Sequence, residues 1–236
     1  VRIDAHGEAA KNFIEKNVET ILDVPDAICV GGKLITKSLE GDNDIVSKVL
    51  SSPFGVGNSS FHVSDKAGYA DTAVYGLYRK EVFREVGYFN EKFVRNQDIE
   101  LHSRIRAAGK KFYFNPEIQC VYYSRNTVKK MAKQAYGNGK WNMVLLKNHS
   151  SALRLRHLVP FAFVLYLIAS IILGFLHRFF WYLGAGVVIL HLLIGLYAAT
   201  KKTKKPIEIL KMPFLFLLLH LSYGVGYLAG VFTKID

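Results

Sequence analysis

The sequence has little cysteine, and none in a spacing that binds metals or forms a disulfide framework. Its 236 residues include two cysteines, Cys29 and Cys120. Each lies in a strand-like apolar run, and no CxxC motif occurs. Two such residues specify no disulfide scaffold. We therefore expect two buried thiols in a reducing compartment.

Several well-known catalytic and nucleotide-binding motifs are also missing. The chain has neither the HExxH zinc motif nor a Walker phosphate loop. His6 and Glu8 have the His-x-Glu order of a zinc deaminase, but the Pro-Cys-x-x-Cys partner of that motif is absent. Gly55 and Gly57 lack the strand and helix that flank a dinucleotide-binding loop. These absences argue against zinc hydrolases, deaminases and dinucleotide-binding enzymes.

Acidic residues are absent from a long central stretch. No Asp or Glu occurs between Glu117 and Glu208, although the chain as a whole has a net charge of +12. The basic side chains ahead of the apolar part are Arg125, Lys129, Lys130, Lys133, Lys140, Lys147, Arg154 and Arg156. Basic residues next to apolar runs fit anionic lipid headgroups better than nucleic acid. We predict a basic amphipathic interfacial segment over 125–157 and no nucleic-acid partner.

Three apolar runs are long enough to cross a bilayer core of about 30 Å as helices. They cover residues 158–176, 179–199 and 212–232. Basic residues precede the first run and separate the second from the third, which places the soluble part in the cytoplasm. We therefore predict a multi-pass protein of the inner (plasma) membrane. His191 and His220 lie within the runs, as functional groups or as neutral side chains bonded to a neighbouring helix.

The soluble part, 1–124, has the alternating pattern of an α/β domain. Helical periodicity or caps predict helices over 8–22, 43–52, 79–87, 96–109 and 127–148, the last interrupted by Gly137 and Gly139. Apolar runs predict strands over 27–35 and 73–78, with two short strands around Pro116. Residues 53–72 are rich in Gly, Ser and Asn and predict a loop over a site.

Two pairs of residues have the chemistry of an active site. Asp4 and His6 project from one face if they end a strand, where they would hold a divalent cation such as Mg²⁺ or Mn²⁺ together with phosphate oxygens. Asp98 and Glu100 begin a helix, where acids interact favourably with the helix dipole. Alternatively, one of these carboxylates faces a cleft and takes a proton from a hydroxyl. The pattern alone leaves both interpretations open.

The order of the motifs resembles glycosyltransferase family 2, in particular its membrane-bound succinoglycan-biosynthesis type. DAH is followed by FGVGNSSF, then by GYFNEKFVRNQDIELHSRIRAAG, then by KQAYGNGKW and membrane helices. The resemblance implies the C-terminal part of a GT-A fold followed by transmembrane helices. It also implies inverting transfer from a nucleotide-diphosphate sugar to a polyprenyl-linked saccharide, as in exopolysaccharide or cell-surface glycan synthesis.

The resemblance also implies roles for single residues. The family's Asp-x-Asp metal motif falls on Asp4 and His6, with histidine in place of the second aspartate, and its catalytic base falls on Asp98. Substrate-binding roles are implied for Gln97, Asp71, Gln134 and Trp141. Asp71 either orients a sugar or caps a turn. Gln134 through Trp141 is a loose counterpart of a Gln-x-x-Arg-Trp stretch, with different spacing and no arginine before Trp141.

The chain opens on Val1-Arg2-Ile3, which reads as the end of a strand. The resemblance implies a preceding nucleotide-binding half, so we expect these residues alone to be inactive or misfolded. Two rival hypotheses remain: a non-catalytic scaffold or export component of polysaccharide assembly, and a small-molecule channel formed by 158–232. Replacement of Asp98 separates an enzyme from both.

Overall fold

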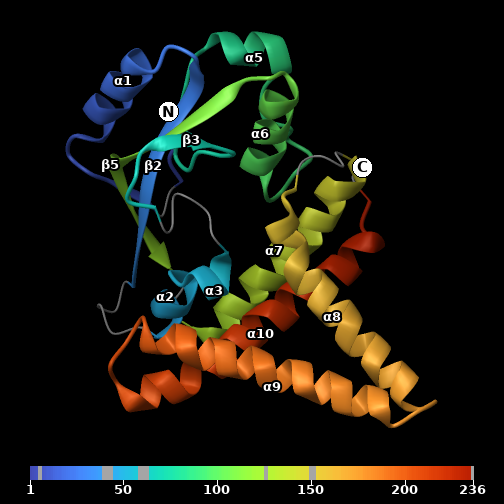
Figure 1. Ribbon diagram of the computed structural model, residues 1–236. Helices are drawn as coiled ribbons and strands as arrows, with labels where there is room; N and C mark the ends of the chain where they lie inside the picture. The colour runs from blue at the N-terminus through green and yellow to red at the C-terminus, as the bar shows by residue number, and fades with distance from the viewer. Residues whose placement is uncertain (5–6, 39–44, 58–63, 125–126, 149–152, 235–236) are drawn as a thin grey trace.

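A computed structural model describes residues 1–4, 7–38, 45–57, 64–124, 127–148 and 153–234. Figure 1 shows a sheet with short helices, joined to the long helices of the C-terminal part. Three of the long helices are sufficiently long and apolar to cross a membrane. This arrangement matches the expected α/β domain followed by apolar C-terminal helices.

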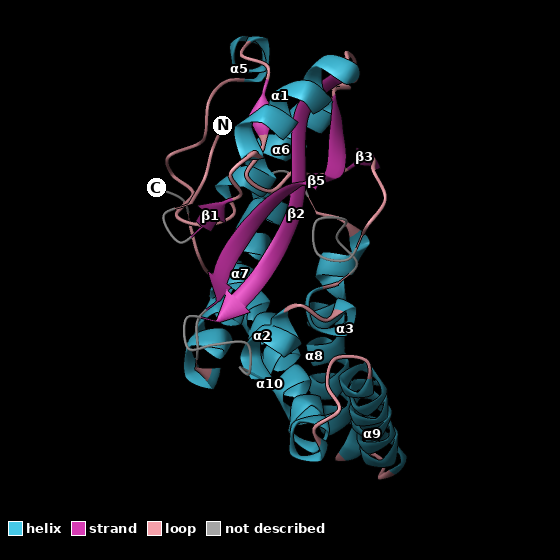
Figure 2. Ribbon diagram, turned by 90° about the vertical axis from the view of Figure 1, so that its left-hand side faces the viewer, coloured by secondary structure: helices cyan, strands magenta, loops and turns pink. Residues whose placement is uncertain are grey.

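The sheet is mixed and is built around two long parallel strands. These are β2 (Ala27–Ser38) and β5 (Lys111–Ser124). Three short strands pair antiparallel with them: β1 (Gly7–Ala9) and β3 (Gly68–Ala70) with β5, and β4 (Leu77–Tyr78) with β2. The resulting strand order is β1-β5-β2-β4, with β3 also on β5. In Figure 2 the two long strands run down toward the long helices.

The predicted break at Pro116 does not divide β5 into two strands. The strand continues, and the pairing with β2 shifts its register between Gly31 and Lys33 instead. Gly32 lies at this shift, where a Cβ atom would stand 1.8 Å from the carbonyl oxygen of Ile118. The glycine therefore permits the close approach of two backbones that keeps β5 continuous.

Helices cover both sides of the sheet. Figure 1 places α1 (Phe13–Asp23) on one side and α5 (Glu81–Val86) with α6 (Gln97–Ala107) on the other. α1 begins later than predicted because Gly7–Ala9 pairs with β5 as a strand. Each side has its own buried cluster, around Phe13 and Ile118 on one side and around Leu101 and Phe112 on the other.

Two short helices join the sheet to the apolar helices. They are α2 (Ile45–Leu50) and α3 (Pro53–Val56), the second within the predicted loop. Val46 and Val49 of α2 share a buried cluster with Phe216 and Leu219 of α10 (Pro206–Val231). The soluble part is thus packed onto the apolar helices.

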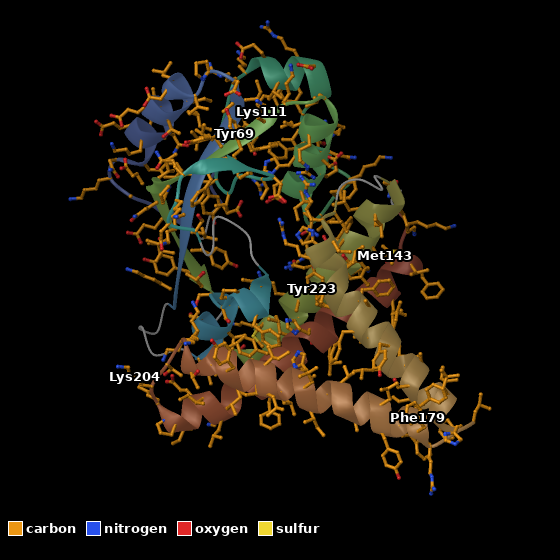
Figure 3. The ribbon with its side chains drawn as sticks, in the orientation of Figure 1. Tyr69, Lys111, Met143, Phe179, Lys204 and Tyr223 are labelled. Carbon is orange, nitrogen blue, oxygen red and sulfur yellow. The ribbon has the colours of Figure 1, made fainter. Side chains whose placement is uncertain are left out.

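The remaining long helices are α7 (Val128–Asn148), α8 (Leu155–Gly174) and α9 (Phe179–Thr200). α7 is continuous, so the expected interruption at Gly137 and Gly139 is absent. Figure 3 shows Phe179 and Lys204 at opposite ends of α9, with Lys204 at the end near α2. His191 Nε2 lies 2.8 Å from His220 Nδ1, so these histidines join α9 to α10.

α10 is bonded to α2 near its start and to α7 at its end. Near its start, Glu208 forms an ion pair with Lys48 of α2 at 2.6 Å. At its end, the carbonyl oxygen of Val231 accepts a hydrogen bond from Lys147 of α7 at 2.9 Å. Between them, a Cβ atom on Gly139 would lie 1.9 Å from the carbonyl oxygen of Tyr223. α7 and α10 therefore pack lengthwise with their backbones in close contact.

Candidate functional site

Asp98 lies in the first turn of α6, directly after a residue of unusual backbone conformation. Asn96 has a φ of 59°, in the left-handed region, and its carbonyl oxygen accepts the first helical bond from Glu100 at 3.0 Å. Asparagine is among the few non-glycine residues that tolerate this conformation. The abrupt start of α6 directs Asp98 to the surface of the soluble part, where it lines two cavities.

The first of these, the Asp4 cavity, brings two predicted site residues together. It has a volume of about 30 Å³ and is lined by Arg2, Asp4, Tyr75, Gly76, Tyr78 and Asp98, among others. Asp4 and Asp98 are 94 positions apart in the sequence, yet their side chains face one small space. The second, the arginine cavity, has a volume of about 100 Å³ and is lined on its polar side by Asp71, Thr72, Asp98, Arg106, Arg154 and Arg156.

Asp4 has the donor chemistry expected of a cation site. Its carboxylate is about one-third exposed, at 35%, and forms an ion pair with Arg2 at 3.0 Å. Mg²⁺ and Mn²⁺ favour carboxylate oxygens and are commonly held by one or two of them plus substrate phosphates. His6 lies outside the described residues. Among the described residues, no group of three or more His, Cys, Asp or Glu could hold a metal by itself.

Glu100, the other acid at the start of α6, is sealed in a buried ion pair. Its side chain is only 1% exposed, and its two oxygens accept hydrogen bonds from Arg104 Nε and Nη2, both at 2.8 Å. Arg104 also donates to the carbonyl oxygen of Tyr88 at 2.7 Å. Of the two carboxylates considered from the sequence, Asp98 is therefore the one that faces a cavity.

A buried histidine connects the two cavities. His102 of α6 is fully buried, with Nδ1 2.6 Å from the hydroxyl of Thr72 and Nε2 2.6 Å from the hydroxyl of Tyr78. Burial, with smaller contributions from Arg106 and Arg2, lowers the pKa of His102 to about 3. The imidazole is therefore neutral at physiological pH and holds a wall residue of each cavity in place.

Tyr75 stands in the wall of the Asp4 cavity with a left-handed backbone, at a φ of 48°. Burial, followed by the nearby charge of Asp4, raises the pKa of its phenol. A bulky residue in this conformation stores backbone strain, which in proteins is concentrated at functional sites. Gly7 packs against the ring, because a Cβ atom there would lie 3.1 Å from it.

Asp71 is held in the arginine cavity. Its carboxylate forms ion pairs with Arg156 at 2.9 Å and Arg154 at 3.2 Å, and its backbone carbonyl accepts a bond from Arg106 at 2.5 Å. Burial by itself would raise the pKa of Asp71, but Arg156 and the other two arginines outweigh burial and lower it. Asp71 is thus an anionic partner of arginines from two distant segments.

The other predicted substrate-binding residues do not line either cavity among the described residues. Gln97 begins α6 beside Asp98. Gln134 donates to the hydroxyl of Tyr122 at 3.2 Å and so ties α7 to β5. Trp141 packs against Phe93, with ring centroids 5.9 Å apart, behind the wall of the arginine cavity.

Sequence reasoning missed the arginines of the site. Arg154 and Arg156 were assigned to lipid headgroups, and Arg2 and Arg106 were given no role. The available signal was the Arg-Leu-Arg run immediately before the first apolar segment, which puts two guanidinium groups at the start of a membrane helix. Their pairing with Asp71, more than 80 positions earlier, has no local signature.

Comparison with known proteins supplies two related glycosyltransferases, although no protein-family model matches the chain. The first is dolichyl N-acetyl-alpha-D-glucosaminyl phosphate 3-beta-D-2,3-diacetamido-2,3-dideoxy-beta-D-glucuronosyltransferase of Methanococcus voltae. It is 32% identical over 234 residues, which cover 96% of this chain and 68% of that protein. The second is succinoglycan biosynthesis protein ExoA of Rhizobium meliloti, 28% identical over 69% of this chain and 49% of its own length.

Proposed function

The chain belongs to the membrane-bound family 2 glycosyltransferases of the succinoglycan-biosynthesis type, and from that premise we propose that it transfers a sugar from a nucleotide-diphosphate donor to a lipid-linked saccharide with inversion. The observation that carries the proposal is the shared cavity of Asp4 and Asp98. Direct displacement requires a base beside the attacking hydroxyl and charge neutralisation at the leaving diphosphate. One cavity with a carboxylate to act as the base and a second carboxylate to hold a cation would meet both requirements.

Asp98 is the proposed base. The hydroxyl oxygen of the acceptor attacks the anomeric carbon while Asp98 takes its proton, and the bond from that carbon to the diphosphate oxygen breaks. Because the attack comes from the face opposite the leaving group, the configuration inverts. Asp98 lies in the first turn of α6, where the partial positive charge of the helix start interacts favourably with a carboxylate.

Asp4 is the proposed anchor on the diphosphate side. Together with His6 it would hold a Mg²⁺ or Mn²⁺ ion, which when bound neutralises charge developing on the leaving diphosphate. Arg2 already pairs with Asp4 and lines the same cavity, so its guanidinium is positioned to contact phosphate oxygens as well.

The acceptor is proposed from the relatives and from the apolar helices. The name of the Methanococcus voltae protein specifies a dolichyl-linked sugar phosphate, and the Rhizobium meliloti protein is named for succinoglycan biosynthesis. Basic residues precede α8 and follow α9, and by the positive-inside rule this supports a site on the cytoplasmic side of the plasma membrane. A lipid-linked saccharide would present its hydroxyl there for cell-surface glycan synthesis.

The test uses the full-length protein in membrane vesicles with labelled nucleotide sugars and extracted lipid-linked saccharides. We expect transfer of label into the lipid fraction, dependent on a divalent cation. Asp98→Asn should lower kcat by about 10²–10⁴-fold, the usual contribution of a general base, without changing the melting temperature. Asp23→Asn, at the exposed end of α1, is the matched control and should keep full activity.

Each alternative outcome has a clear meaning. Undiminished transfer by the Asp98→Asn protein would reject the proposed base. Complete absence of transfer by the folded wild-type protein, together with normal glycan assembly in cells that carry Asp98→Asn, would support a scaffold. Solute flux through proteoliposomes that does not depend on Asp4 or Asp98 would support a channel.

A further inference from the structure

Three arginines from distant parts of the chain converge on one acidic residue, Asp71. Arg106 comes from the end of α6, whereas Arg154 and Arg156 come from the start of α8. All three contact Asp71, two through its side chain and one through its backbone carbonyl. A protein gains little by gathering three guanidinium groups around one acid, because the like charges repel one another. Such a cluster is typical of sites that bind phosphate.

The cluster encloses space and has unused bonding capacity. The three arginines line a cavity of about 100 Å³, so the space beside them is not filled by other side chains. Arg156 Nε is shielded from solvent and has no hydrogen-bond partner among the described residues. A buried donor left without a partner is destabilising, so its presence points to a ligand that supplies an acceptor. Arg156 pairs with Asp71 through Nη2, and Arg154 pairs with it through its own Nε. Neither ion pair therefore involves Arg156 Nε.

The location of the cavity identifies which phosphate it suits. Arg154 immediately precedes α8, an apolar helix of 20 residues, so the cavity lies where a membrane helix meets the soluble part. Asp98 stands in the wall of this cavity and also in the wall of the Asp4 cavity. If the Asp4 cavity takes the donor diphosphate, the arginine cavity lies on the acceptor side of the same carboxylate.

We propose that Arg106, Arg154 and Arg156 form a binding subsite for the lipid-proximal phosphate of the acceptor, and that the Asp71 carboxylate occupies this subsite until the phosphate displaces it. This inference rests on the proposed transferase function. Displacement of Asp71 exchanges one carboxylate for a phosphate with more charge and more acceptor oxygens, which matches the excess of guanidinium groups. The subsite would hold the lipid-linked saccharide so that its reacting hydroxyl reaches Asp98.

The first experiment measures binding, so that it does not depend on turnover. Farnesyl phosphate is titrated into the full-length protein in detergent, with farnesol, which lacks the phosphate, as the comparison ligand. We expect saturable binding of farnesyl phosphate that is about 10–100-fold weaker in Arg156→Gln and partly restored in Arg156→Lys. Arg84→Gln, on the exposed side of α5, is the matched control and should bind as the wild type does.

The Asp71→Asn variant tests whether the Asp71 carboxylate competes with phosphate for the arginines or instead holds the arginines in place. It keeps the side-chain shape but removes the charge that faces Arg154 and Arg156, so we expect farnesyl phosphate to bind several-fold more tightly. Weaker binding by a folded Asp71→Asn protein would overturn the displacement model. Equal binding of farnesyl phosphate and farnesol, or equal binding by wild type and Arg156→Gln, would overturn the subsite itself.

The second experiment identifies the source of the phosphate during catalysis. In Arg156→Gln we expect the KM for the lipid-linked acceptor to rise about 10–100-fold, with the KM for the nucleotide sugar unchanged. A rise confined to the nucleotide-sugar KM, with weaker inhibition by nucleoside diphosphate, would assign the cluster to the donor and reject the proposal. Loss of transfer in the wild type alongside normal farnesyl phosphate binding would instead reject the proposed function and leave the subsite standing.

Discussion

The side-chain amide of Asn96 donates a hydrogen bond to the side-chain oxygen of Asn142 at 2.6 Å. Asn142 in turn donates its own amide to the hydroxyl of Tyr223. Asn96 precedes α6, Asn142 lies in α7 and Tyr223 lies in α10, and Figure 3 labels Tyr223 among these long helices. A chain of three polar side chains therefore links an apolar helix to the residue that begins the Asp98 helix.

Replacement of Asn142 should disturb the site without touching it. Asn142→Leu removes both bonds, so we expect a loss of stability of about 1–3 kcal/mol and a lower kcat, with substrate KM values little changed. Tyr223→Phe removes one bond and should have a smaller effect on both. Melting temperature and kinetics in detergent provide the measurement. Equal effects of the two variants would contradict a chain that acts through Asn142.

The two acids of α6 should respond in opposite ways to loss of charge. Glu100→Gln leaves Arg104 without its buried partner, so we expect the free energy of unfolding to fall by about 3 kcal/mol. Asp98→Asn should leave stability nearly unchanged and lower kcat by about 10²–10⁴-fold. Thermal unfolding and transfer assays of both proteins check this contrast. A stable but inactive Glu100→Gln protein would show that the wrong carboxylate has been assigned as the base.

The protein should lose stability in mild acid because of His102. Its pKa is about 3 when folded, compared with 6.5 for an unperturbed histidine. Between these values the unfolded state binds a proton that the folded state does not, so stability falls as the pH is lowered from about 6.5 toward 3. At pH 5 the loss is about 2 kcal/mol from this residue.

His102→Gln should flatten the stability profile in this pH range. The amide can still bond to Thr72 and Tyr78 but does not titrate. Thermal unfolding at pH 7 and pH 5 should show a smaller difference for His102→Gln than for the wild type. Identical differences would mean that His102 is not the group responsible.

The contact between α7 and α10 should not tolerate a larger residue. A Cβ atom on Gly226 would lie 2.1 Å from the carbonyl oxygen of Tyr136, whereas one on Gly186 of α9 would meet nothing within 4 Å. We therefore expect Gly226→Val to unfold or inactivate the protein and Gly186→Val to behave as the wild type. Expression, melting temperature and transfer activity in membranes provide the measurement. Normal behaviour of Gly226→Val would show that α7 and α10 are not packed this closely.

The sequence is sufficient to predict the helices whose positions are determined by a local pattern of residues. Apolar length locates α8 and α9 within a few residues, and the cap and stop signals locate α6. α10 starts at Pro206, earlier than the predicted span, because Glu208 is used in an ion pair with Lys48 rather than exposed to lipid. The hydropathy pattern therefore predicts a helix boundary less well where a tertiary ion pair accommodates a single charged residue.

Glycines illustrate why the rest could not be predicted. Gly137 and Gly139 locally favour a break in α7, but the helix continues, with the Arg95 side chain beside Gly137 and the backbone of α10 beside Gly139. The site is similar in kind: Asp98 was identified by motif, whereas the arginines around Asp71 depend on contacts between segments 35 to 85 positions apart. Only a folded chain brings such residues together.

The close contact along α7 and α10 has a consequence for the choice of substrate. The backbones of α7 and α10 are in close contact, and α10 is also bonded to α2 near its start and to α7 at its end. If the chain acts as proposed, the distance between Asp98 and the apolar helices limits which saccharides can reach the base, so acceptors one sugar shorter or longer should be transferred less efficiently.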